Sequence, residues 1–377
     1  MNILHLASGD LWAGAEVQLF HLSTRLSRQE GIKLLVVLFN HGQLEDELKQ
    51  RNISVAVLDE TRLSGFAILR ELNKLVKVFQ PDIIHTHRHK ENIIGGLIAV
   101  LNRKKSVRTV HGANEHPRGL LNFRRFILTL LDGFSARVMQ QKIIAVSNEL
   151  KGEVSNIYPP SRITVIENCV DINYVEDMSK ELSDGHVAKD SFNVAFIGRF
   201  VQVKRVDLFY AIAKSAITRF STEEINFHML GEGPLKNDID EMITRDKLGA
   251  GIHLHGFVQN VPPMLKQMDL LMITSDHEGL PMTLLEAMTL RVPVLSRAIP
   301  SIHRVLCNGE CGYIVASDKV EHFVDAIEVI MTDTVDVNAR VSAARAKIET
   351  EYNIDVNIEH YLQLYMAVSG KKELGQC

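Results

Sequence analysis

The sequence predicts an α/β protein of two doubly wound domains, and three observations support this fold class. The chain has 377 residues, a length that favours two domains. Short apolar runs alternate with amphipathic segments, which is typical of parallel sheets covered by helices on both faces. The alternation stops in one polar, acidic stretch between residues 172 and 191. We therefore expect an N-terminal domain at 1–172, a linker at 173–190, a second domain at 191–353, and a helical segment at 354–377.

Each predicted domain begins with a buried strand and continues as alternating strands and helices. Strands are expected at 2–8, 33–39, 54–58, 82–86, 107–110, 142–146 and 163–166, with helices such as 15–28 and 65–80 between them. In the second domain, strands are expected at 192–197, 225–230, 252–254, 270–273, 292–295 and 312–315, with helices such as 205–220, 281–290 and 319–331. Sheets of this kind bind ligands at the carboxyl ends of their strands, so we expect the site in the cleft between the two domains.

The composition excludes several classes of protein. Hydrophobic residues make up 46% and charged residues 23%, which rules out disordered, collagen-like and coiled-coil chains. The net charge of −4 gives no reason to expect nucleic-acid binding. Four scattered cysteines (Cys169, Cys307, Cys311, Cys377) do not form a disulfide framework, so we expect reduced thiols and a cytoplasmic protein. The longest apolar run, 92–102, is about half of what a membrane span requires, and the N-terminus is typical of a strand rather than a signal peptide.

The charge is divided unevenly along the chain. Residues 1–180 carry 23 Lys and Arg against 19 Asp and Glu, whereas residues 181–377 carry 19 against 27. A basic patch at 101–142 interleaves with apolar residues such as Phe126 and Leu130, and only Glu115 and Asp132 oppose it. The basic side chains of this patch are Arg103, Lys104, Lys105, Arg108, Arg118, Arg124, Arg125, Arg137 and Lys142. Two interpretations stay open, an amphipathic helix with a solvated basic edge and a surface that contacts an anionic membrane.

The loop after the predicted strand 192–197 carries two cations close together. It begins with Gly198 and Arg199, and Lys204 follows five residues after the arginine. Glycine allows the sharp turn, and both cations can then point at one anion. The pair suits a diphosphate, because Arg forms a bidentate fork and Lys acts as a mobile point charge. The alternative is a pair of solvated surface cations.

The loop after the predicted strand 225–230 contains Gly231, Gly233 and Pro234. These residues predict a helix that begins at the proline, with backbone N–H groups that can cradle a phosphate. Because a lone G-x-G is common, an ordinary tight turn is the alternative.

The most informative segment is 274–288, which follows a buried strand and begins a helix. Glu278 lies in the loop, and Glu286 lies one to two turns into the helix. Gly279 exposes the N–H groups through Leu280 and Pro281, so the helix N-terminus can face phosphates while the two carboxylates accept hydrogen bonds from sugar or ribose hydroxyls. Glu286 can also serve only the helix dipole, but its apolar helix predicts burial, and a buried acid needs a partner.

The segment E-G-L-P-M-T-L-L-E-A-M, which contains Glu278 and Glu286, resembles the signature of family 4 retaining glycosyltransferases. The resemblance extends along most of the chain, in the order and at the distances of the family. The similar segments are Gly14-Ala15-Glu16, Thr109-Val110-His111-Gly112, Ala145-Val146-Ser147, Asn168-Cys169-Val170-Asp171, Gly198-Arg199-Phe200 with Lys204, Leu230-Gly231-Glu232-Gly233-Pro234 and His255-Gly256-Phe257-Val258. The resemblance implies the GT-B fold, with two Rossmann-like domains facing each other across a cleft and residues 354–377 packing back on the first domain.

The chain departs from the family pattern in three places. Cys169 replaces a usual glycine, and Arg205 stands where glycine is frequent. Residues 297–301 replace a glycine-rich turn that leads to a glutamate, so the resemblance says nothing about phosphate contacts in that loop.

The resemblance also implies the reaction and the residue roles. A sugar would move from a nucleotide diphosphate sugar, expected to be UDP-linked, to an acceptor hydroxyl with retention of the anomeric configuration. Arg199 and Lys204 would stabilise the leaving diphosphate, and His111 would orient the sugar near the anomeric centre. Glu278 would hold sugar hydroxyls and Glu286 the ribose hydroxyls. The backbone groups of the donor site would come from Gly14, Ala15, Gly198, Gly231, Gly233, Gly279, Leu280 and Pro281.

We expect no metal ion, because these cations would take its place and no D-x-D motif lies in a suitable loop. The run His85-Thr86-His87-Arg88-His89 places three histidines on one face, but no acidic partner stands at ligand spacing. Same-face attack assisted by the departing phosphate is favoured over a covalent intermediate, because nothing supplies an unmistakable nucleophile.

The expected partners are the nucleotide-sugar donor and a glycan or lipid-linked acceptor, in bacterial polysaccharide, lipopolysaccharide or glycolipid synthesis at the inner face of the membrane. Two alternatives remain open, a nucleotide-sugar epimerase of the same fold and a non-catalytic sugar-nucleotide-binding protein. A two-Rossmann oxidoreductase is disfavoured, because residues 9–14 lack the G-x-G-x-x-G spacing.

Overall fold

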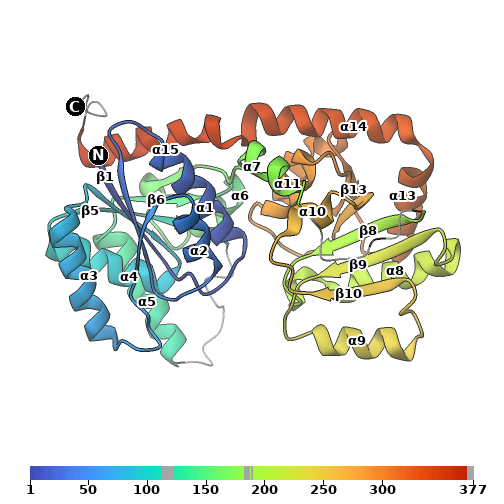
Figure 1. Ribbon diagram of the computed structural model, residues 1–377, viewed down its shortest axis with the longest axis horizontal. Coiled ribbons are helices and arrows are strands. Elements are labelled where there is room, and N and C mark those ends of the chain that lie inside the picture. Colours follow the sequence, from blue (N-terminus) through green and yellow to red (C-terminus); the bar gives the residue numbers. More distant parts are fainter. Residues whose placement is uncertain (113–122, 182–186, 188–189, 372–377) are drawn as a thin grey trace. The chain divides into compact units, whose positions relative to one another are not determined.

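The computed structural model describes residues 1–112, 123–181, 187 and 190–371, with the backbone alone at 123–129. The chain forms two compact units (Figure 1). The N-terminal unit combines Met1–Cys169 with Ile354–Cys377, and the C-terminal unit is Val170–Asn353. Among the helices of the described residues, none is long and apolar enough to cross a membrane.

The N-terminal unit is built on a seven-stranded parallel sheet in the order β3-β2-β1-β4-β5-β6-β7. Its strands are β1 Asn2–Ala7, β2 Lys33–Leu38, β3 Ser54–Val57, β4 Ile83–His87, β5 Lys105–Val110, β6 Lys142–Ala145 and β7 Ile163–Val165. Its helices are α1 Gly14–Ser27, α2 Gln43–Gln50, α3 Gly65–Phe79, α4 His89–Leu101, α5 Phe123–Val138, α6 Asn148–Val154 and α15 Ile354–Ser369. Helix α4 packs against α3 and α5, and α1 packs against α2 and α15 (Figure 1).

The C-terminal unit repeats the plan with a six-stranded parallel sheet in the order β10-β9-β8-β11-β12-β13. Its strands are β8 Phe192–Ile197, β9 Ile225–Leu230, β10 Ile252–Gly256, β11 Leu270–Ile273, β12 Val294–Arg297 and β13 Tyr313–Val315. Its helices are α7 Ile172–Met178, α8 Val206–Phe220, α9 Lys236–Arg245, α10 Val261–Leu265, α11 Met282–Thr289, α12 Pro300–Val305, α13 Val320–Thr332 and α14 Thr334–Lys347. Buried apolar side chains of α8 and of the central strands form the core.

Two boundaries differ from the expectations. Residues 172–178, expected to begin or lie within the linker, form α7, which packs against α10 and α11 inside the C-terminal unit. Ile172 and Val175 are buried there, so the apolar side chains of this largely polar stretch pack it into the unit. Helix α9 begins at Lys236 rather than at Pro234. The C-terminal helix α15 contacts α1 and β4, which assigns Ile354–Ser369 to the N-terminal unit.

The strand order places a switch point in each sheet. In the N-terminal unit β1 lies between β2 and β4, and in the C-terminal unit β8 lies between β9 and β11. The connections leave in opposite directions on the two sides of such a strand, which opens a crevice at the carboxyl edge. The loops after β1 and β4, and after β8 and β11, are therefore the places to look for a site.

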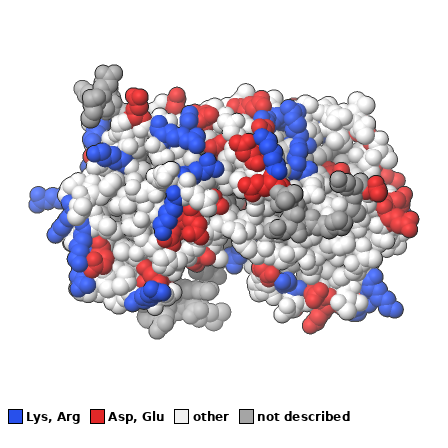
Figure 2. Space-filling view, viewed as in Figure 1, with Lys and Arg blue, Asp and Glu red and all other residues white. Residues whose placement is uncertain are grey.

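Not all side chains of the basic patch predicted at 101–142 lie on the surface. Arg108 is completely buried on β5, where its Nη1 donates to Asp132 Oδ2 at 2.8 Å and to the Tyr158 hydroxyl at 3.0 Å. Arg103, Lys105 and Arg137 are exposed, and Lys104 and Lys142 are half-buried. Arg118 and the side chains of Arg124 and Arg125 lie outside the described residues, as do those of most apolar residues predicted with them. Figure 2 shows charges of both signs on each unit, so on this face the imbalance produces no single-sign surface.

The environment of Asp132 explains why Arg108 has a structural role. Burial raises the pKa of the Asp132 carboxyl, but the hydrogen bond with His89 and the charge of Arg108 outweigh burial and hold the pKa well below its usual range. The carboxylate is therefore charged at neutral pH and depends on its cationic neighbour.

Arg108→Met should lower the free energy of unfolding by about 3–5 kcal/mol, because it leaves a buried carboxylate without its cation. Urea unfolding at pH 7 measures the change, and Arg103→Met, at an exposed neighbouring position, should change stability by less than about 0.5 kcal/mol. Equal effects of the two substitutions would contradict the assignment.

Candidate functional site

An ion pair joins the two loops at the switch point of the C-terminal unit. Lys204 follows β8, and its Nζ lies 2.5 Å from Oε1 of Glu278, which follows β11. The Ser275 hydroxyl donates to the same carboxylate oxygen at 2.6 Å. Both charged side chains are only partly exposed. The residue predicted to bind phosphate and the residue predicted to bind the sugar therefore form an ion pair with each other.

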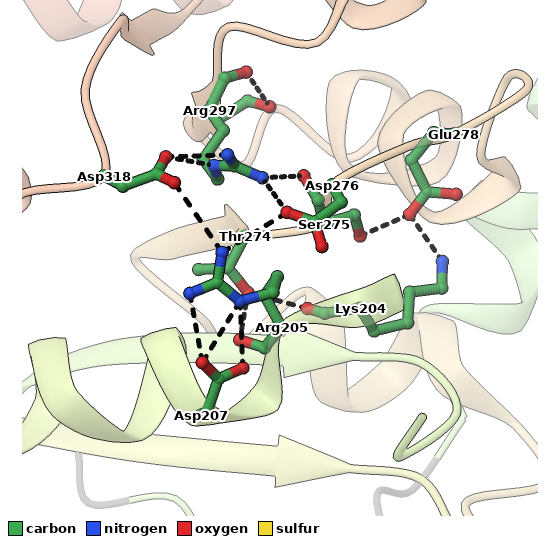
Figure 3. A network of polar contacts seen from close by, with 10 residues as sticks. Lys204, Arg205, Asp207, Thr274, Ser275, Asp276, Glu278, Arg297 and Asp318 are labelled. Carbon is green, nitrogen blue, oxygen red and sulfur yellow. Dashed lines mark hydrogen bonds and ion pairs between the residues drawn. The ribbon is translucent and has the colours of Figure 1, made fainter. Parts of the chain in front are cut away.

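The backbone of these two loops is tied together beneath the ion pair (Figure 3). The Thr274 hydroxyl donates to the carbonyl oxygen of Lys204 at 3.0 Å, and the Asp276 N–H donates to that of Val203 at 2.8 Å. Arg205 adopts a left-handed conformation with φ 48° and ψ 50°, which explains why glycine suits this position. Its guanidinium bonds Asp207 at 3.0 Å and Asp276 at 3.3 Å, which compensates the backbone cost.

Arg297 at the end of β12 supports the same loop. Its Nη1 donates to the Ser275 carbonyl oxygen at 2.9 Å and to Asp276 Oδ1 at 2.7 Å, and its Nη2 pairs with Asp318 at 2.7 Å (Figure 3). The Ser301 hydroxyl donates to the carbonyl oxygen of Glu278 at 2.9 Å. The 297–301 segment therefore holds the Glu278 loop in place.

The glycines after β9 let two loops approach closely. A Cβ on Gly231 would lie 2.0 Å from the Gly198 carbonyl oxygen, and one on Gly233 would lie 2.5 Å from that of Phe200. The Gly231 N–H donates to the Gly256 carbonyl oxygen at 2.7 Å, so one of the predicted phosphate donors is already engaged. These glycines shape the floor of the site by bringing the loops after β8 and β9 into contact.

Glu286 is the buried acid that the sequence predicted. Its side chain on α11 is buried and makes no hydrogen bond or ion pair with any residue that the structure describes. Burial raises the pKa of its carboxyl to about 7. A carboxyl of this kind is a candidate acceptor for ligand hydroxyls, because a buried polar group without a partner is costly. The preceding residues Gly279, Leu280 and Pro281 lead directly into the same helix, with Pro281 at its N-cap.

Arg199 is the other cation that the sequence predicts in the site of the C-terminal unit. It is exposed, directly after Gly198, and its side chain has no ion-pair partner among the described residues. Unlike Lys204, it is therefore available to an anion without displacing a carboxylate.

In the N-terminal unit, the predicted residues Gly14 and Ala15 follow β1 at the switch point, whereas His111 follows β5, one strand away from it. Helix α1 begins at Gly14 and Ala15, and the next residue, Glu16, is buried and pairs with Arg88 at the end of β4. His111 follows β5 and is half-buried. Burial, with the charge of Arg88 adding to it, lowers the pKa of His111 to about 3, so its imidazole is neutral.

The structure adds residues that the sequence did not single out as ligands. The predicted side chains are supported by Arg88, Arg297 and the acids around Arg205. In the sequence, the one signal for Arg88 and Arg297 was an arginine at a strand end. His85 and His87 lie on β4 together, whereas His89 begins α4 and contacts Asp132 at 3.1 Å. His5, His85 and His87 have ring nitrogens within 4.8 Å of one another. Both nitrogens of His85 already contact Tyr365 and Thr109, at 2.6 and 2.8 Å.

Comparison with known proteins gives matches for both halves of the chain. The model "Glycosyltransferase Family 4" matches residues 12–174, and the model "Glycosyl transferases group 1" matches residues 178–348. Together the two models cover most of the sequence, and the second contains Arg199, Lys204, Glu278 and Glu286.

Individual relatives extend over the same length. The chain is 25% identical over 334 residues to the Escherichia coli UDP-Gal:alpha-D-GlcNAc-diphosphoundecaprenol alpha-1,3-galactosyltransferase, covering 86% of this chain and 85% of that protein. It is 23% identical to the Staphylococcus aureus capsular polysaccharide biosynthesis glycosyltransferase CapM, covering 85% and 87%. The structure of Anabaena HepE in complex with UDP-glucose superposes with a TM-score of 0.81 at 19% identity, covering 97% of this chain and 100% of that one. This last likeness shows the GT-B fold predicted from the sequence.

Replacing Glu286 with Gln should stabilise the protein at high pH and have little effect at low pH. The pKa of Glu286 rises from 4.5 to about 7 on folding, so the native state binds the extra proton between these values and loses stability as the pH increases. At pH 8 the variant should be more stable by up to about 3 kcal/mol, and at pH 5 the difference should be below about 1 kcal/mol.

Urea unfolding at both pH values measures this difference. Glu241→Gln, at an exposed position on α9, should have the same small effect at pH 5 and at pH 8. A Glu286→Gln effect that does not change with pH would show that burial of this carboxyl has been misjudged.

Proposed function

The chain belongs to the glycosyltransferases described by the family 4 and group 1 models, and from this premise we propose that it transfers a hexosyl or N-acetylhexosaminyl group from a UDP-sugar, with retention, to an acceptor hydroxyl. The acceptor is a glycan or a lipid-linked glycan in bacterial polysaccharide, lipopolysaccharide or glycolipid synthesis. The names of the relatives support both parts, because one uses UDP-Gal on a diphosphoundecaprenol-linked sugar and another acts in capsule synthesis.

One observation carries the donor proposal: the unpartnered, buried Glu286 carboxyl lies on the helix that follows the Lys204–Glu278 ion pair. A nucleotide sugar carries a binding partner for each of these side chains. Ribose hydroxyls donate to Glu286, and the diphosphate takes Lys204 from Glu278 while Arg199 binds it as a second cation. Glu278 is then released to accept hydrogen bonds from sugar hydroxyls. Binding of the donor thus breaks the Lys204–Glu278 ion pair, and each of these two residues contacts the donor instead.

The proposed chemistry is charge stabilisation on the leaving group. As the bond between the anomeric carbon and the diphosphate breaks, Arg199 and Lys204 stabilise the developing negative charge. The acceptor hydroxyl attacks the same face and transfers its proton to the departing phosphate oxygen, which gives retention. This scheme needs no metal ion, because the two cations supply the charge. His111 orients the sugar by a hydrogen bond from its neutral imidazole.

The exposed face of α5 supports contact with a membrane that carries the acceptor. Leu130, Phe134 and Val138 repeat every four residues and are more than half exposed, at 57%, 53% and 59%. Arg137, also exposed, lies on the same helix, and Arg103 follows the end of α4, which packs against α5. Apolar residues flanked by cations suit the surface of an anionic membrane.

Nucleotide binding tests the donor proposal. In calorimetric titrations with UDP-, GDP- and ADP-sugars, the UDP-linked donors should bind most tightly. Arg199→Ala and Lys204→Ala should each weaken UDP binding about tenfold or more, because each removes a charge-assisted hydrogen bond.

Lys214→Ala is the matched control, because Lys214 is an ion-paired lysine of the same unit, bonded to Asp246 at 2.5 Å. Its substitution should leave UDP affinity unchanged. Failure of all three nucleotide classes to bind would overturn the donor proposal, and a transfer product of inverted anomeric configuration, measured by NMR, would overturn retention.

Vesicle sedimentation tests the membrane proposal. The protein should sediment with anionic vesicles at low salt, and replacing Leu130, Phe134 and Val138 with Gln should reduce the bound fraction at least fivefold, because burial of three apolar side chains is lost. Replacing Phe66 and Val78 on α3, which are 78% and 85% exposed, should leave binding unchanged. Equal loss in both variants, or no binding by the wild type, would refute a specific contact through α5.

A further inference from the structure

Two thiols are in contact in the C-terminal unit, at the turn that joins α12 to β13. The S–H group of Cys311 donates to Sγ of Cys307, and the two sulfur atoms lie 2.9 Å apart. The sulfur atoms of a disulfide are about 2.05 Å apart, so a bond between these two needs little further approach. The other cysteine that the structure describes, Cys169, is buried in the N-terminal unit, where Gln18 donates to its sulfur at 3.4 Å.

The backbone between the two cysteines makes this contact. The Leu306 carbonyl oxygen accepts hydrogen bonds from the N–H groups of Gly309 and Cys311, at 2.9 and 3.0 Å. Three consecutive residues of the turn have a positive φ, 51° at Cys307, 55° at Asn308 and 109° at Gly309. The first two are not glycines, so the turn that brings residue 311 back to residue 307 costs free energy that other contacts must offset.

Arg340 of α14 holds the turn in this conformation. Its Nη1 donates to the carbonyl oxygens of Gly309 and Gly312, the second at 3.1 Å, and its Nε pairs with Asp336 at 2.7 Å. The guanidinium also lies over the ring of Tyr313, 4.6 Å from the ring centroid. The folded unit therefore keeps the two sulfur atoms in contact.

The two thiols have different surroundings. Cys311 is buried, and burial together with the neighbouring Cys307 raises the pKa of its thiol to about 12. Cys307 is only half-buried, and its sulfur accepts the S–H hydrogen bond. Lys347 interacts electrostatically with both cysteines. A reagent therefore reaches Cys307 first, while Cys311 stays a protonated thiol in contact with it.

We infer that Cys307 and Cys311 form a reversible dithiol–disulfide pair whose oxidant is a low-molecular-weight disulfide of the glutathione type. Cys307 is the attacking sulfur, because it is the more exposed of the two, and Cys311 is the resolving sulfur. The pair lies within the C-terminal unit, and its chemistry is independent of the proposed glycosyl transfer.

The reaction consists of two successive thiol–disulfide exchanges. The Cys307 thiolate attacks one sulfur of the reagent, the S–S bond of the reagent breaks, and the first reagent thiolate leaves. Cys311 then loses its proton and attacks Sγ of Cys307, so that the mixed disulfide breaks and the second reagent thiolate leaves. The two protons lost by the protein thiols end on the two reagent thiolates. One protein disulfide and two reagent thiols are formed, and two electrons pass from the protein to the reagent.

Peptide mapping of the full-length protein detects this disulfide directly. The protein is treated with glutathione disulfide, quenched with acid and N-ethylmaleimide in denaturant, and digested with trypsin. Residues 305–319 form one tryptic peptide that contains both cysteines, whereas Cys169 and Cys377 fall in other peptides. The oxidised peptide should carry no maleimide and be lighter than the reduced, unmodified peptide by two hydrogen atoms. Prior treatment with dithiothreitol should restore two maleimide adducts.

Two results of this mapping would overturn the inference. One is a peptide that carries two maleimides at every ratio of glutathione to glutathione disulfide. The other is a peptide that stops with one glutathione and one maleimide, because Cys311 would then fail to resolve the mixed disulfide.

The equilibrium distinguishes a pair held by the fold from two cysteines that are only close in sequence. At the midpoint of oxidation, the squared glutathione concentration divided by the glutathione disulfide concentration gives the effective concentration of one thiol at the other. This value should be at least tenfold higher for the native protein than for the chain unfolded in urea. An equal or lower value would show that the folded turn does not favour the bond, and would overturn the inference.

Single substitutions test the two roles. In Cys311→Ser, Cys307 should stop at the mixed disulfide with glutathione. In Cys307→Ser, Cys311 should react at least tenfold more slowly than Cys307 does in Cys311→Ser, because Cys311 is buried. The reverse order of rates would overturn the role of Cys307 as the attacking sulfur. Cys169→Ser is the matched control, and it should leave the midpoint of oxidation unchanged, whereas a shifted midpoint would contradict the assignment to this pair.

Discussion

The ion pair between Lys204 and Glu278 joins the loops at the switch point of the C-terminal unit, and the contacts around it depend on this junction. It exists because the strand order sets β8 beside β11, so that loops separated by about 70 residues end at the same edge of the sheet. Two half-buried charges at such an edge stabilise each other, because each would be costly without its partner. The surrounding hydrogen bonds and ion pairs hold both loops in place next to the Lys204–Glu278 pair. Among them, Thr274 holds the first loop and Arg297 holds the second.

Buried polar groups in this chain fall into two kinds. Arg108 and Asp132 are completely buried and bonded to each other, and they tie β5 to α5. The outer nitrogen of His111, by contrast, is buried without a partner among the described residues, and the buried Glu286 side chain forms no ion pair with any of them. Folding gains nothing from leaving a polar atom unsatisfied, so such atoms are expected where a ligand supplies the missing bond. Glu286 lies on the helix after β11, at the switch point of the C-terminal unit, whereas His111 follows β5, one strand beyond the switch point of the N-terminal unit.

The two units differ in the chemistry of the polar side chains at the ends of their strands. In the C-terminal unit, Lys204 and Arg205 at the switch point are paired with carboxylates, whereas Arg199 has no ion-pair partner among the described residues. In the N-terminal unit, burial keeps the histidines neutral, and the charged pair is Arg88 with Glu16.

The sequence alone determined the two-domain α/β plan, because strand periodicity and apolar character are local properties. Each predicted strand lies within two residues of an observed one, and Glu286 was correctly expected to be a buried acid. Local patterns could not show that Arg108 is internal, since one buried carboxylate 24 residues away decides it. They also could not show that residues 172–178 form a helix, that the Gly231 N–H is already used, or that Lys204 and Glu278 meet. Only the tertiary structure decided these points, because each depends on which strands become neighbours.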